Sequence, residues 1–215
     1  MPLDLAKFIE SRPRLFHLTA RSNVALIRRA GRLETAARLL DRGGRRPAIR
    51  ERRRDSLIIP VGDDEVHIRD QAPLHAGNLS LPAGWTFADF VAHLNEHVFL
   101  WPGTEAGPIS YGRRHFERYA GEDNSVLVLD TAAVVEANRR PEIRFCRYNS
   151  GSPRCTGGKP SPRGPGTFVT SSEYAGVPSS VVEVVFRGGI VLPARGLAVV
   201  APESLRSATP GNGQG

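Results

Sequence analysis

The chain has 215 residues, of which 40% are hydrophobic and 24% charged, a balance typical of a globular protein with a sizeable core. It carries a net charge of +7, and nearly all of its basic residues are arginines, since Lys7 and Lys159 are the two lysines. No stretch approaches the roughly 18 consecutive apolar residues of a membrane span, and Asp4 and Glu10 interrupt any signal-peptide pattern. We therefore expect a cytoplasmic protein without membrane contact.

The arginine excess has two interpretations. It is either a solvated surface on a compositionally biased background or a match for a phosphate-rich partner, because guanidinium groups pair bidentately with phosphate. The two cysteines, Cys146 and Cys155, fit no metal-binding spacing, so we expect reduced thiols and no metal.

The first half of the chain contains short helices and strands with clear boundary signals. Pro13 ends the first helix, Gly31 ends the second, and Thr35 caps the third. The predicted elements are a helix over 3–11, a strand over 16–19, helices over 23–30 and 36–40, and extended segments over 57–61 and 66–70.

The second half is predicted to be richer in strands. An amphipathic helix capped by Thr86 runs to His97, and the strand that follows stops at Pro102. The remaining predicted elements are a helix around 116 ending near 120, a strand over 125–129, a mobile glycine- and proline-rich loop over 150–166, and strands over 181–186 and 197–200. We expect one domain over residues 1–206 and a disordered tail over 207–215.

His17 and Thr19 are two residues apart in an apolar β-type run, so their side chains lie on one face of the predicted strand. Asn23 follows at the start of a helix. A neutral imidazole and a hydroxyl on one face suit a ribose diol and a carboxamide. The alternative for His17 is a hydrogen-bonded core histidine at a strand end.

The segment 15–33, with its His-x-Thr strand, its asparagine and a helix ending in Gly31-Arg32-Leu33, resembles the opening of the DarT-type ADP-ribosyltransferases. The resemblance implies that NAD is bound as a substrate, with the ribose at His17, the nicotinamide side at Thr19 and a second contact at Asn23. The chain lacks the tyrosine-containing strand and the Arg-Ser-Pro of DarT itself, so it is similar to a related branch.

An arginine-rich segment follows, with six arginines over residues 45–54. In the resembling enzymes one arginine of this region contacts the NAD phosphates and assists catalysis. This implies a catalytic role for Arg53 and cofactor contacts for Arg52 and Arg54, with an uncertainty of one position. The alternatives are a solvated face or a nucleic-acid patch.

The segment 94–102 resembles a family strand with consecutive aromatic residues, one of which packs against the nicotinamide. This implies a stacking role for Phe99 or Trp101, since a flat ring suits a cationic pyridinium. Both are equally consistent with ordinary core aromatics.

Glu183 lies in the run 181–185, and the other four residues of this run are valines. An ionised carboxylate in a strand that is apolar on both faces is costly unless it has a partner or a function. The resemblance implies the catalytic glutamate, which stabilises an oxocarbenium-like ribose as nicotinamide leaves. The alternative is a solvent-facing acid on an edge strand. The segment 170–174 is similar to the loop that precedes such a strand, but Glu173 lies too far upstream for an arginine-modifying enzyme.

These motifs together predict an α+β, ADP-ribosyltransferase-like fold with a split, mostly antiparallel sheet and surrounding helices. The implied function is ADP-ribose transfer from NAD to a nucleic acid or another macromolecule, in a toxin with an antitoxin-type protein partner. Transfer of a 2′-phosphate on RNA is a related alternative. The alternative from another class is a non-catalytic nucleic-acid- or nucleotide-binding protein with a degenerate fold.

Overall fold

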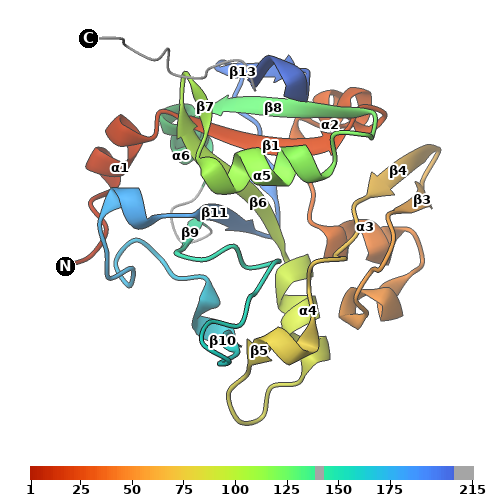
Figure 1. Cartoon of the computed structure of the whole chain (residues 1–215). Coiled ribbons are helices and arrows are strands. Elements are labelled where there is room, and N and C mark those ends of the chain that lie inside the picture. The colour runs from red at the N-terminus through yellow and green to blue at the C-terminus, as the bar shows by residue number, and fades with distance from the viewer. Residues whose placement is uncertain (139–142, 206–215) are drawn as a thin grey trace.

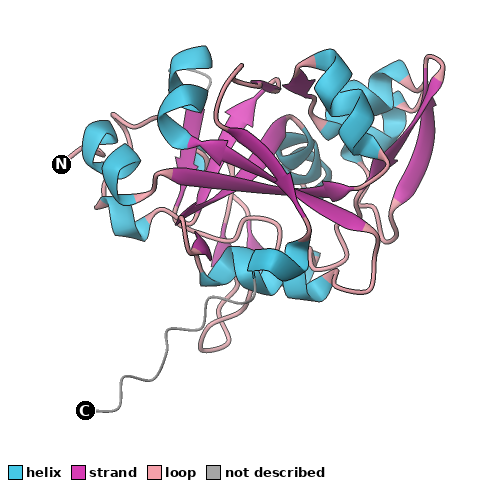
Figure 2. Ribbon diagram, turned by 90° about the horizontal axis from the view of Figure 1, so that it is seen from above, coloured by secondary structure: helices cyan, strands magenta, loops and turns pink. Residues whose placement is uncertain are grey.

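The computed structural model describes residues 1–138 and 143–205. A central antiparallel sheet crosses the middle of the molecule, with helices around it (Figures 1 and 2). Its strand order is β13-β8-β1-β6-β11-β9, and β7 pairs with the far end of β6. The strands are β1 (Arg14–Ala20), β6 (His97–Thr104), β7 (Gly107–Pro108), β8 (Asn124–Asp130), β9 (Ile143–Cys146), β11 (Glu183–Arg187) and β13 (Leu197–Val200).

Six α-helices lie in the described part of the chain. They are α1 (Leu5–Ser11), α2 (Asn23–Ala30), α3 (Ala36–Arg42), α4 (Phe87–Asn95), α5 (Ser110–Arg118) and α6 (Thr131–Ala137). Three small strand pairs lie outside the central sheet: β2 (Arg32–Leu33) with β12 (Ile190–Val191), β3 (Leu57–Val61) with β4 (Asp64–Ile68), and β5 (Leu79–Ser80) with β10 (Ser161–Pro162). None of the described helices has the length and apolar character needed to cross a membrane.

The sheet divides in its middle. Strand β1 pairs with β8 at seven positions but with β6 at only three, from Arg14 opposite Gly103 to Phe16 opposite Trp101. Beyond Phe16 the two strands separate, and β6 runs diagonally away from β1 (Figure 1). Where the backbone hydrogen bonds between β1 and β6 end, a side chain connects the two strands: His17 Nδ1 lies 2.9 Å from the carbonyl oxygen of Phe99.

Alternation along the strands builds a core on each face of the sheet. Leu100, Val184 and Phe186 belong to the larger core, while Trp101 and Val185 face the opposite side. A fourth apolar cluster, which we call the hairpin core, lies outside the central sheet. It contains Leu40, Ile59, Val61, Val66 and Ile68, from α3 and the β3–β4 hairpin.

Most of the predicted elements are confirmed within a few residues, including β3 and β13, whose bounds agree fully. Thr86 forms a capping box with Asp89, and Gly31 ends α2 with a φ of 61°, which a residue without a Cβ adopts at little cost. The predicted tail over 207–215 lies outside the described residues.

Two of the predicted boundaries that differ from the structure have a clear physical reason. The helix predicted to reach His97 ends at Asn95, because His97 already pairs with Arg187 at the start of β6. The strand predicted to stop at Pro102 continues to Thr104. The Pro102 carbonyl accepts a hydrogen bond from the Ile109 N–H, so the missing proline N–H points to that side and costs no bond with β1.

Candidate active site

A cavity of about 580 Å³ opens where β1 and β6 separate. Its walls come from both halves of the sheet, from β4 and α5, and from the segment 147–163 that follows β9. The volume lies within the range of small-molecule and cofactor sites. The divided sheet therefore provides a ligand-sized space lined by strand residues.

Seven of the nine predicted site residues lie in the wall of this cavity: His17, Thr19, Asn23, Arg53, Phe99, Trp101 and Glu183. Arg52 and Arg54 do not. They line a separate cavity of about 470 Å³, and Arg53 borders both. Arg52 donates to the carbonyl oxygens of Gln71 and Ala72, and Arg54 is exposed.

Glu183 lies at the start of β11, between β6 and β9, and only 2% of it is exposed. Its Oε1 accepts a hydrogen bond of 3.2 Å from the Ser150 N–H, and its Oε2 has no partner among the described residues. Burial raises the pKa of Glu183 to about 7, against the opposing effects of Ser150 and the positive charge of Arg163. The carboxyl group therefore changes charge near neutral pH, and it is not a solvent-facing acid on an edge strand.

His17 presents one ring nitrogen to the cavity. Its Nδ1 must donate to the Phe99 carbonyl, so in the neutral ring Nε2 is a hydrogen-bond acceptor. Burial lowers the pKa of His17, and the nearby Arg69 charge acts in the same direction. A neutral imidazole whose Nε2 is a free acceptor can accept a hydrogen bond from a hydroxyl group of a ligand.

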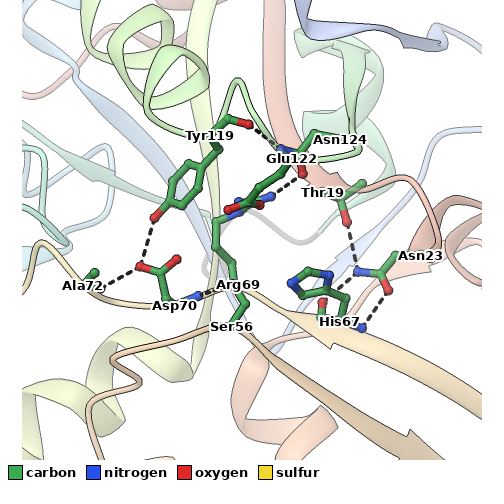
Figure 3. A network of polar contacts seen from close by, with 10 residues as sticks. All are labelled: Thr19, Asn23, Ser56, His67, Arg69, Asp70, Ala72, Tyr119, Glu122 and Asn124. Atoms are coloured by element: carbon green, nitrogen blue, oxygen red, sulfur yellow. Dashed lines mark hydrogen bonds and ion pairs between the residues drawn. The ribbon is translucent and has the colours of Figure 1, made fainter.

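Thr19 and Asn23 belong to a polar network that joins α2 to β4 (Figure 3). Asn23 Nδ2 donates to Thr19 Oγ1 at 3.2 Å and to the His67 carbonyl at 2.8 Å, and Asn23 Oδ1 accepts from the His67 N–H. Both amide protons of Asn23 are thus already used, whereas the Thr19 hydroxyl proton is free to reach a ligand. Asn23 therefore holds α2 against β4, and its amide has no free proton for a ligand.

Arg53 is 9% exposed and has no carboxylate within 4 Å among the described residues. Its Nε donates to the Arg69 carbonyl and its Nη1 to Asn95 Oδ1, both at 2.9 Å. Burial lowers the pKa of Arg53 to about 10, so it remains charged at neutral pH. A buried, charged guanidinium held by neutral oxygens is suited to bind an anion.

The two aromatic candidates differ in exposure. Trp101 is 5% exposed and packs with Phe16 and Phe116, as an ordinary core residue does. Phe99 is partly exposed, and its ring meets that of Phe168 edge-on, with the centroids 5.7 Å apart. Phe99 is thus the more available of the two for a flat ligand.

The structure adds cavity residues that the sequence did not indicate. Arg69 donates to Glu122 at 2.7 Å and to Asn124 at 2.6 Å and lies over the Tyr119 ring, and the Tyr119 hydroxyl donates to Asp70 (Figure 3). Arg163 lies near Glu183, in a segment whose glycines and prolines give no periodic signal. A helix can be recognised in a sequence from its capping residue, such as Thr86, whereas a cavity wall built from loops has no comparable sequence pattern.

The cavity is strongly basic. Eight arginines line it, against three carboxylates, which are Glu34, Asp70 and Glu183. Converging cations in a partly enclosed space favour a ligand with several negative charges. Within residues 1–138 and 143–205, no three His, Cys, Asp or Glu side chains form a group that could hold a metal ion.

The fold and site together define a mixed α/β protein with a basic, ligand-sized cavity in a divided, antiparallel sheet. The chain belongs to a family of unknown function, DUF7002, whose model matches residues 13–195. The matched region includes every predicted site residue. No curated protein and no solved structure matches the chain.

Proposed function

We propose that this protein is an ADP-ribosyltransferase with an ADP-ribosyltransferase-like fold, which uses NAD as its substrate. The observation that carries the proposal is the position of Glu183. Among the residues that the structure describes, it is the one buried carboxylate, and one of its oxygens has no hydrogen-bond partner there; its strand borders a basic cavity.

The residues in the cavity wall suit the parts of NAD. The pyrophosphate matches buried arginines without carboxylate partners, of which Arg53 is the clearest. The ribose hydroxyls match the acceptor nitrogen of His17 and the free proton of Thr19. The nicotinamide ring matches the partly exposed face of Phe99.

The proposed reaction replaces one bond to the ribose by another. The glycosidic bond from C1′ to the nicotinamide nitrogen breaks, its electron pair stays on that nitrogen, and neutral nicotinamide leaves. A nucleophilic atom of the acceptor then bonds to C1′ and loses its proton to the Glu183 carboxylate. Ionised Glu183 stabilises the positive charge that develops on the ribose, and its burial strengthens that interaction.

The acceptor is proposed to be a nucleic acid or another macromolecule. Guanidinium groups attract and position a polyanion without regard to sequence, and the chain has a net charge of +7. Uncontrolled ADP-ribosylation of nucleic acid would damage the cell that makes the enzyme, so we also propose a toxin role with a neutralising protein partner.

The first prediction tests the catalytic role of Glu183. Glu183→Gln keeps the shape of the side chain and removes its charge, so release of nicotinamide should fall on the order of a hundredfold or more, while NAD binding is retained. Nicotinamide release from labelled NAD should be measured at pH 8 with DNA, RNA and protein pools as acceptors.

Glu173→Gln is the matched control, because Glu173 is exposed and does not line the cavity. Wild-type turnover in Glu183→Gln would contradict the proposal. If the wild-type protein binds NAD or nucleic acid and never releases nicotinamide, the non-catalytic binding protein is the better description.

A further inference from the structure

The segment between β9 and η4 (Pro165–Thr167) brings two buried polar side chains close to Glu183. Ser150 is fully buried and Arg163 is 7% exposed, although both lie in a stretch rich in glycine and proline. Polar groups are seldom buried to this extent unless they have partners. Their partners therefore indicate what this segment does.

Ser150 fixes one side of the Glu183 carboxylate. Its backbone N–H donates to Oε1, and Ser150 as a whole favours the ionised form of the carboxylate. Ser150 Oγ and Glu183 Oε2 are both buried and have no hydrogen-bond partner among the described residues.

Arg163 is held in place by neutral groups. Its Nη1 donates to the Pro162 carbonyl at 2.8 Å and its Nη2 to the Asn149 carbonyl at 3.4 Å, and its guanidinium carbon lies 4.3 Å from the centre of the Tyr148 ring. Across the part of the chain that the structure describes, it has no carboxylate within 4 Å. Its charge favours the ionised forms of two nearby acidic groups, Cys146 and Glu183.

The arginine and the glutamate are joined through two consecutive residues. Asn149 accepts from Arg163, and the next residue, Ser150, donates to Glu183. A further titratable group beside Glu183 is Cys146, which lies opposite it in the β9–β11 register. Burial raises the pKa of the Cys146 thiol, so this neighbour stays uncharged and adds no negative charge that would oppose ionisation of Glu183.

We propose that Arg163 is a positioning residue for Glu183: through its hydrogen bond to the Asn149 carbonyl it holds the Asn149–Ser150 step that orients the carboxylate, and its positive charge favours the ionised carboxylate together with the Ser150 N–H. Its effect on ionisation is independent of the proposed reaction, and only its effect on turnover rests on that function.

The direct test is the titration of the Glu183 carboxyl carbon by NMR in protein labelled at glutamate, with Glu183→Gln identifying the signal. In Arg163→Met or Arg163→Gln the midpoint should move measurably to higher pH, because the positive charge that favours the ionised carboxylate is lost. Arg163→Lys should restore most of the wild-type midpoint. Lys159→Met, which removes a charge from an exposed position of the same segment, should leave it unchanged.

An unchanged Glu183 midpoint in folded Arg163→Met would overturn the proposal. If the neutral variants fold at pH 5, where Glu183 is protonated, and not at pH 8, the proposal is supported, because the charge is needed only when the carboxylate ionises. If they fold at neither pH, Arg163 serves the fold and the proposal is wrong. If the wild type turns NAD over, the rising limb of the pH–rate profile should shift in the Arg163 variants by the same amount as the Glu183 midpoint. If the wild type shows no turnover, that result counts against the proposed function and not against the role of Arg163.

Discussion

At the scale of single residues, burial and local partners act in opposite directions on the pKa of Glu183, and burial prevails. Burial in β11 favours the neutral acid, whereas the Ser150 N–H and the Arg163 charge favour the carboxylate. The outcome is a pKa of about 7, which suits a group that must be ionised to stabilise positive charge and then accept a proton. The same balance affects the stability of the fold.

The second prediction concerns pH and stability. The pKa of Glu183 rises from 4.5 to about 7 on folding, so between these values the folded state holds a proton that the unfolded chain has lost. The free energy of unfolding of the wild type should therefore fall as pH increases from about 4.5 to about 7, and the loss should stop above that range. Relative to Glu183→Gln, the loss should be about 3 kcal/mol at most.

Urea unfolding at pH 5, 6, 7 and 8 measures this difference. Glu173→Gln should follow the wild type across the range, because hydrogen bonds from Thr170 lower the pKa of Glu173 and its titration ends at a more acidic pH. Parallel curves for wild type and Glu183→Gln would show that burial of Glu183 does not oppose its ionisation.

At the scale of elements, the arginine-rich segment shows how neighbours with the same side chain take different positions. The short helix η1 (Arg46–Arg50) packs Ala48 and Ile49 against the hairpin core, and Asn95 Nδ2 donates to the Ile49 carbonyl. With the segment anchored in this way, Arg53 points inward to Asn95, and Arg54 points to solvent.

The third prediction follows from this difference. Arg53→Met should lower NAD turnover by at least about tenfold, because a charged guanidinium at the cavity wall is lost. It should also reduce stability by about 1–3 kcal/mol, because Asn95 Oδ1 and the Arg69 carbonyl lose a charged donor. Arg54→Met should change either quantity little.

Nicotinamide release without acceptor, together with nucleic-acid binding at two salt concentrations, separates the interpretations of this segment. Equal, salt-dependent losses in both variants would favour a phosphate-tracking patch over an NAD clamp.

The elements that the sequence predicted are those whose signals are local. Thr86 three residues before Asp89 is a capping box, and Gly31 marks a helix end, whatever surrounds them. Helix α6 was missed although Asp130 caps it through the Ala133 N–H, because its alanines and valines give no helical periodicity.

The site residues likewise differ in whether a local sequence signal reveals them. Glu183 stands out in its own strand, whereas Arg163 becomes recognisable only when Asn149 and Tyr148 are brought to it by the folded segment. The direction of each arginine in 52–54 likewise depends on contacts with Gln71 and Asn95, which are distant in sequence.

At the scale of the whole molecule, several polar contacts join the hairpin core and the residues next to it to the helices and strands of the main body. Asn23 clamps His67, Arg53 reaches Asn95, and Arg69 reaches Glu122 and Asn124. The apolar cluster itself is separate from those on the two faces of the sheet. One wall of the cavity, including Arg53 and His67, therefore belongs to a part of the fold with its own small core.

We expect a part of this kind to open as a cooperative unit. Breaking a few hydrogen bonds and ion pairs exposes much less apolar surface than separating β1 from β8, so local opening should need less free energy than global unfolding. Amide hydrogen exchange should thus be faster in β3 and β4 than in β1 and β8, and addition of NAD should slow it selectively in the hairpin. Equal exchange rates in all four strands would mean that the hairpin and the sheet unfold together. If β3 and β4 exchange faster than β1 and β8, the hairpin is a cavity wall that opens separately from the sheet. The rate of this opening would then set an upper limit on how fast a ligand can enter or leave by that route.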